Sequence, residues 1–97
     1  MKDTEMKRLD YSEIISKLQK GWTFNPDKNE IEKDFDLGNF TASAAFILKI
    51  ADVAESLDHH PDLLLHDYKM VRVSIATHAA GGITDLDFTL AQKIDDL

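Results

Sequence analysis

The chain has 97 residues, of which 43% are hydrophobic and 30% charged, with a formal net charge of −7. This length and composition fit one soluble domain with a single modest core, which oligomerisation would help to stabilise. The negative charge argues against direct binding to nucleic acid, and no apolar run approaches the roughly 20 residues that a membrane span requires. Because there is no Cys, disulfides, thiolate nucleophiles and Cys-based zinc sites are excluded.

The first residues, MKDTEMKRLD, are charged and lack the apolar core of a secretory signal. We therefore take the cytoplasm as the default compartment, with the nucleus left open. Residues 1–8 have no apolar periodicity and are predicted to form a flexible tail before one domain over residues 9–97. Asp10, with Glu13 three positions on, matches a capping box and predicts that the first helix starts there. Gly21 is a natural C-terminal stop for that helix.

A hairpin is predicted next. Residues 22–24 form a short strand, residues 25–29 are rich in turn formers, and residues 31–37 alternate along a second strand. One face of that second strand is acidic and must meet water or a cation. The acidic residues are Glu32, Asp34 and Asp36.

Residues 40–57 are apolar at so many positions that more than one side of the predicted helix needs a partner. Either this helix is the central element of the domain, or part of it packs against another subunit. Pro61 disfavours the α conformation at the residue before it, so the helix cannot continue through the sequence Asp-His-His-Pro at 58–61. The histidine pair is therefore expected in a helix-to-strand turn.

A strand or loop should follow, and then a strand over residues 68–77 whose side chains alternate between two faces. One face carries Val71, Val73, Ile75 and Thr77, and the other carries Tyr68, Met70, Arg72, Ser74 and Ala76. After a turn at Gly81-Gly82, Thr84 with Asp87 predicts a second capping box and the last helix, which would bury Phe88, Ala91 and Ile94, with Leu97 as a further candidate.

The predicted order is thus α-β-β-α-β-β-α. Consecutive hairpins favour an antiparallel sheet, so we predict an α+β fold: a single domain with an antiparallel four-stranded sheet and three helices packed on one face.

The four histidines suggest a metal site, a proton-transfer site or surface decoration. Metal is disfavoured because the side chains of His59 and His60 diverge, and no H-E-x-x-H or i, i+4 pair is present. His66, between Leu65 and Asp67, fits a surface position. His59, His60 and His78 could instead line one cleft, where imidazoles both give and take protons near neutral pH. From the residues alone a structural alternative stays open, in which His60 caps a backbone carbonyl and His78 packs on the sheet.

The spacing of five anchors resembles the signature of the pterin-4a-carbinolamine dehydratases, a family that includes a dimerisation cofactor of a homeodomain transcription factor. The anchors are Glu55, His59-His60-Pro61, Tyr68, His78 and Asp87. Further similar positions run from about Leu9 to Leu97. The chain departs from the family at Leu63, where an aromatic residue is common, and at Lys69, where Asn is common.

The resemblance implies a hydro-lyase that dehydrates 4a-hydroxytetrahydropterin to quinonoid dihydropterin and so recycles the cofactor of aromatic amino acid hydroxylases. It implies catalysis by His59, His60 and His78 without metal or cofactor, the pterin being the substrate. We expect His60 and His78 to flank the C4a hydroxyl and His59 to orient the substrate. The residues expected to bind substrate are Glu55, Asp58, His59, His60, Ala76, Thr77, His78, Ala79 and Asp87.

Two of these acids have alternative duties. Asp87 would be explained equally well by helix capping, although it could also orient a histidine. Glu55 could pair with a histidine and raise its pKa, bind the amino-pyrimidine edge of the pterin, or lie in solvent at the helix end. The resemblance further implies a homodimer formed by extending sheets edge to edge, or a homotetramer formed by packing helices. A rival function is binding a protein partner, as a scaffold similar to a transcriptional coactivator, with little or no dehydratase activity.

Overall fold

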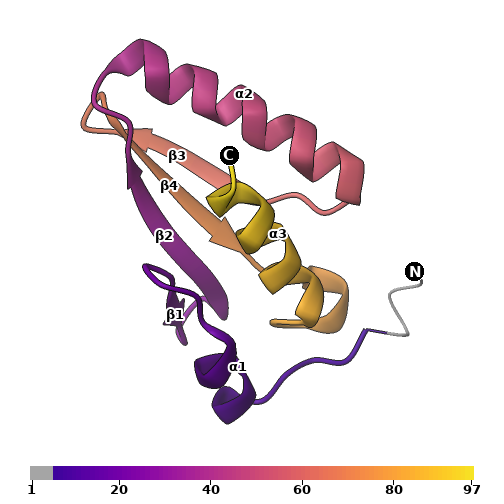
Figure 1. Ribbon diagram of the computed structural model, residues 1–97. Coiled ribbons are helices and arrows are strands. Elements are labelled where there is room, and N and C mark those ends of the chain that lie inside the picture. The colour runs from indigo at the N-terminus through magenta and orange to yellow at the C-terminus, as the bar shows by residue number, and fades with distance from the viewer. Residues whose placement is uncertain (1–5) are drawn as a thin grey trace.

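The computed structural model describes residues 6–97, and the predicted order of helices and strands is confirmed (Figure 1). One short 3-10 helix, η2, adds to that order after the last strand. The elements are α1 (Tyr11–Lys17), β1 (Thr23–Asn25), β2 (Glu30–Asp36), α2 (Phe40–Leu57), β3 (Asp62–His66), β4 (Met70–Ile75), η2 (His78–Ala80) and α3 (Asp85–Asp95).

The four strands form one open sheet in the order β1-β2-β4-β3, and each neighbouring pair is antiparallel. The segment that the sequence left as strand or loop is the edge strand β3, because its backbone pairs with β4 from Asp62 opposite Ser74 to His66 opposite Met70. On β2, Ile31 lies opposite Ile75. The predicted α+β fold with an antiparallel four-stranded sheet is therefore confirmed.

The core lies between the sheet and its helices. The predicted apolar face of β4 is buried throughout, since Val71, Val73 and Ile75 have no exposed surface. Helices α1, α2 and α3 each place side chains against this face. Their buried residues include Ile14, Phe46, Ile50, Leu90, Ala91 and Ile94. Each large apolar side chain buried in this way contributes roughly 1.5–3 kcal/mol.

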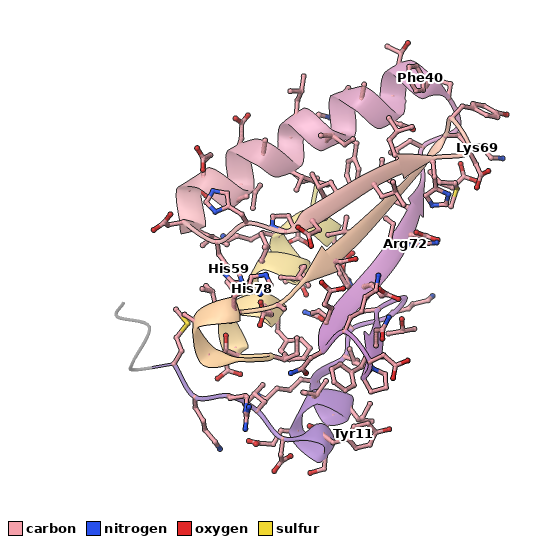
Figure 2. All side chains as sticks on the ribbon, turned by 180° about the vertical axis from the view of Figure 1, so that it is seen from behind. Tyr11, Phe40, His59, Lys69, Arg72 and His78 are labelled. Atoms are coloured by element: carbon pink, nitrogen blue, oxygen red, sulfur yellow. The ribbon has the colours of Figure 1, made fainter. Side chains whose placement is uncertain are left out.

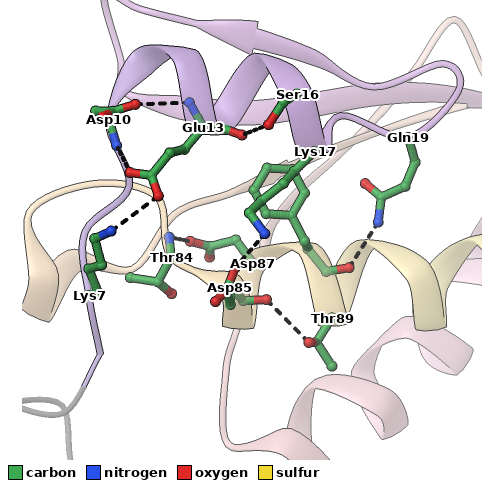
Figure 3. A network of polar contacts seen from close by, with 11 residues as sticks. Lys7, Asp10, Glu13, Ser16, Lys17, Gln19, Thr84, Asp85, Asp87 and Thr89 are labelled. Atoms are coloured by element: carbon green, nitrogen blue, oxygen red, sulfur yellow. Dashed lines mark hydrogen bonds and ion pairs between the residues drawn. The ribbon is translucent and has the colours of Figure 1, made fainter.

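Helix α1 begins where the sequence predicted but ends earlier. Both halves of the capping box are present, with Asp10 Oδ1 2.9 Å from the Glu13 amide nitrogen (Figure 3). The helix stops at Lys17 because Leu18 turns to an extended conformation, so the prediction of Gly21 as its stop is wrong. The side chain of Gln19 donates to the carbonyl of Phe88 at 3.1 Å, and this contact with α3 accompanies the early end of the helix.

The predicted flexible tail, residues 1–8, lies for the most part outside the described residues. Of its last residues, Lys7 lies 3.1 Å from a carboxylate oxygen of Glu13, and Leu9 beyond it donates its amide to Ile83 at 2.8 Å. The chain entering α1 is thus held beside the segment that leads into α3.

Helix α2 has one buried stripe and one uncovered side within this chain. Its buried residues are Ser43, Phe46, Ile50 and Ala54, spaced as one helical face. On other sides, Phe40 is 61% exposed and Leu48 is 70% exposed. The helix therefore packs on the sheet and α3, but this chain alone does not cover all of its apolar surface.

Candidate active site

The histidine pair follows a tight turn at the end of α2. Asp58 adopts the left-handed conformation with φ of 50°, which non-glycine residues other than Asn and Asp rarely visit. The amide of Asp58 donates a hydrogen bond to the carbonyl of Glu55 at 3.2 Å, and the amide of His59 donates one to the carbonyl of Ala54 at 3.1 Å. The prediction that the helix ends before His59 is confirmed, and the turn sends His59 back towards α3.

His59 is held by a buried carboxylate. Its Nε2 lies 2.6 Å from Oδ1 of Asp87, and the two side chains are 11% and 0% exposed. The other oxygen, Oδ2 of Asp87, accepts hydrogen bonds from the Thr84 amide and the Thr77 hydroxyl, each at 2.8 Å. Asp87 therefore performs both duties considered for it, since one oxygen caps α3 and the other orients a histidine.

His78 opens a short loop that the strand end and two glycines shape. The backbones of Thr77 and Gly82 pair with each other, which closes the loop between them. Gly81 has φ of 75°, a conformation that favours glycine, and Gly82 lies against the side chain of Asn29, since a Cβ there would be 2.7 Å from Nδ2 of Asn29. The side chain of His78 is exposed, at the same end of the molecule as His59 (Figure 2).

His60 lies at the surface and pairs with Glu55. Nε2 of His60 is 2.5 Å from Oε2 of Glu55, and these side chains are 58% and 75% exposed. Two of the alternatives suggested for Glu55 are found together, because its carboxylate is solvent-exposed and also bonded to a histidine. Nδ1 of His60 takes no part in this pair and has no hydrogen-bond partner among residues 6–97.

The predicted site residues gather where the α2–β3 turn, the end of β4 and the start of α3 meet. Asp87 joins these segments, since it bonds both His59 and Thr77, the neighbour of His78. Ala76 is half-buried and Ala79 exposed. Thr77 was expected to bind substrate, but its side chain is 4% exposed and points inward to Asp87.

Sequence reasoning missed the hydroxyl of Thr84, which lies 2.9 Å from that of Thr77. A signal was available in the alternation along β4. Thr77 continues the buried face formed by Val71, Val73 and Ile75, and a buried hydroxyl needs a hydrogen-bond partner. The nearby capping box supplied the candidates, Thr84 and Asp87.

Two negative observations apply to residues 6–97. No three His, Asp or Glu side chains in this range are grouped as the ligands of a metal ion would be. Within the same range, no helix has both the length and the hydrophobicity needed to cross a membrane.

The family model described as pterin 4 alpha carbinolamine dehydratase matches residues 7–97. Because this match spans nearly the whole chain, the protein belongs to the pterin-4a-carbinolamine dehydratase family. The family that the sequence resembles is thus confirmed.

Several relatives carry the name "Putative pterin-4-alpha-carbinolamine dehydratase". The protein from Metallosphaera sedula is 44% identical over 94 residues, which cover 95% of each chain. That from Sulfurisphaera tokodaii is 45% identical, covering 95% of this chain and 98% of its own. A crystal structure described as a transcriptional coactivator/pterin dehydratase from Brucella melitensis superposes with a TM-score of 0.85 at 34% identity, covering 93% of this chain and 97% of the other.

Proposed function

We propose that this protein dehydrates a 4a-hydroxytetrahydropterin to quinonoid dihydropterin and water, and so recycles the pterin cofactor of aromatic amino acid hydroxylases. The observation that carries the proposal is the pairing of a largely buried His59 with the fully buried Asp87, beside two exposed histidines on the flanking segments. A solvated surface histidine has no structural need for a buried carboxylate, whereas an imidazole that must meet a substrate in one orientation does.

The reaction needs two proton transfers and one bond cleavage. An acid protonates the hydroxyl on C4a, the C4a–O bond breaks, and the oxygen leaves as water. The N5 lone pair forms the new C4a–N5 double bond, and a base takes the proton from N5. Imidazoles can serve as both acid and base near neutral pH, so the step requires no metal and no covalent intermediate.

We assign the proton transfers to His60 and His78, and the orientation of substrate to His59. His60 and His78 are exposed, so a pterin could reach both rings, whereas His59 is fixed by Asp87. Glu55 would hold the ring of His60. Asp58 and the backbone from Ala76 to Ala79 would complete the walls of the substrate site.

The test is the decay of chemically generated 4a-carbinolamine. Wild-type protein should accelerate it, and His60→Ala or His78→Ala should remove about 10²- to 10⁴-fold of the rate, as expected for an acid or base. Both side chains are exposed, so both variants should keep the circular dichroism spectrum and melting temperature of the wild type.

His66→Ala is the matched control, because it removes an imidazole from β3, on the outer face of the sheet, and should leave the rate unchanged. Wild-type protein without activity would overturn the proposal and favour the binding function. An equal loss in all three variants would overturn the assignment of residues.

We also propose that the chain forms a homodimer or homotetramer, because the uncovered side of α2 carries Leu48 and Phe40, which are 70% and 61% exposed. The same surface supports the alternative function, binding of a protein partner. The cytoplasmic location stays a prediction.

A further inference from the structure

The buried polar groups behind His59 form a hydrogen-bonded chain that the proposed reaction does not use directly. Thr77, Thr84 and Asp87 are 4%, 1% and 0% exposed. Oγ1 of Thr77 lies 2.8 Å from Oδ2 of Asp87 and 2.9 Å from Oγ1 of Thr84. Burying three polar side chains in a small core costs free energy unless each is bonded, so their arrangement requires a reason.

The number of available protons determines which group donates and which accepts in each of these hydrogen bonds. An ionised carboxylate only accepts hydrogen bonds, so Thr77 must donate its single proton to Oδ2 of Asp87. Thr77 then accepts from Thr84, whose other neighbour, Sδ of Met6 at 4.0 Å, is a much weaker acceptor. Oδ2 also accepts from the Thr84 amide, so this oxygen is fully occupied and the carboxylate cannot rotate freely.

The remaining oxygen, Oδ1, therefore faces His59 in one orientation. Because Oδ1 can only accept, Nε2 of His59 must carry a proton. In the neutral ring the lone pair is then on Nδ1, for which no partner exists among the described residues. A neutral His59 can thus only accept at its free nitrogen, and the N–H groups of a pterin are donors suited to it.

We propose that Thr77 and Thr84 are positioning residues, whose hydroxyls act through Asp87 to hold the ring and tautomer of His59 so that Nδ1 receives an N–H donor of the substrate. This inference rests on the proposed function for the identity of the substrate. The inference about the tautomer stands on the hydrogen bonds alone.

The variant that tests the hydrogen-bonded chain from Thr84 to His59 is Thr77→Val, which keeps the shape of the side chain and removes the hydroxyl. The ring nitrogens of His59 are followed by ¹⁵N NMR at alkaline pH, with the decay of 4a-carbinolamine measured in parallel. Wild type should show a protonated Nε2 and an unprotonated Nδ1. Thr77→Val should show a mixture of tautomers and lose up to about 100-fold in kcat/KM, the scale expected when a reacting group is displaced by about 1 Å. Thr77→Ser restores a hydroxyl and should recover both.

Ser43→Ala is the matched control for the loss of a buried hydroxyl. Ser43 is 0% exposed and its hydroxyl bonds the carbonyl of Asn39, at the opposite end of α2 from His59. This variant should change neither the tautomer of His59 nor kcat/KM.

The possible failures are distinguishable. An inactive wild type overturns the proposed function, while the NMR comparison still tests whether the hydrogen-bonded chain holds the tautomer of His59. An active wild type with a proton on Nδ1 rather than Nε2 overturns the inference, and this result needs no variant to fold. The inference is equally overturned when Thr77→Val folds and keeps both the tautomer and the activity of the wild type.

Discussion

His66 illustrates how position decides what a histidine does. On the outer face of the sheet, its Nδ1 lies 2.8 Å from Asp67 and its Nε2 lies 3.4 Å from Asp34. The bond to Asp67, followed by that to Asp34, raises the pKa of His66 above its ordinary value of 6.5. Arg72 donates two hydrogen bonds to Asp34 and lowers the pKa of that carboxyl. Of the acidic residues predicted to meet water or a cation on β2, Asp34 thus pairs with Arg72, and Asp36 lies 3.9 Å from Nζ of Lys69.

We predict that His66 titrates above pH 6.5 in the folded protein, as measured by NMR. Asp67→Asn should lower its pKa more than Asp34→Asn, because the bond to Asp67 is the larger cause of the shift. A pKa raised by folding stabilises the native state fully below pH 6.5, and this stabilisation disappears as the pH rises through the folded value. The stability difference between wild type and His66→Asn should therefore shrink over that range, and a His66 pKa at or below 6.5 would contradict the network.

At the scale of the element, α2 determines where the histidine pair lies. The side chain of Ile50 on this helix has no exposed surface and anchors the helix against the sheet and α3. The C-terminal turn then carries His59 to Asp87 on α3. The packing of the helix and the geometry of the site are consequently linked.

We predict that Ile50→Ala lowers the free energy of unfolding by about 2–5 kcal/mol, because it removes buried apolar surface and leaves a cavity. The same substitution at Ile15, which is 45% exposed on α1, should cost less than about 1 kcal/mol. Urea denaturation followed by tryptophan fluorescence measures both, since Trp22 is buried. Equal costs at the two positions would show that α2 is not anchored as described.

The elements differ in how far the sequence could predict them. The alternation along β4 indicated its buried face, and Pro61 indicated the end of α2, because both signals depend on local geometry. Other features depend on partners that are distant in the sequence. The early end of α1 accompanies the contact of Gln19 with Phe88, and residues 62–66 form a strand because they pair with β4. The spacing from Thr84 to Asp87 predicted a cap, but the contact from Asp87 to His59 spans 28 residues and requires the tertiary fold.

At the scale of the whole molecule, the uncovered side of α2 is the feature that one chain leaves unexplained. Leu48 is 70% exposed although α2 is rich in apolar residues, and small soluble domains seldom leave such a surface without a use. The sequence offered two explanations for this excess, a central helix or a subunit contact. In the isolated chain one stripe of α2 is buried, so a subunit contact is the explanation that we propose for the rest.

We predict that Leu48→Glu lowers the mass of the assembly in sedimentation equilibrium, because it places a charge on the proposed contact. The wild type should have two or four times the mass of the 11.0 kDa chain. Ile15→Glu places the same charge on α1 and should leave the mass unchanged. A monomeric wild type, or the same oligomer for wild type and Leu48→Glu, would contradict the proposed contact.

The most direct test of the proposed function is a crystal structure of the protein with a bound dihydropterin. If His59, His60 and His78 serve one reaction, all three rings will lie around the C4a–N5 edge of that pterin, with Nδ1 of His59 accepting from one of its N–H groups. A pterin bound elsewhere, or one that touches His59 while His60 and His78 remain out of reach of C4a, would contradict the account.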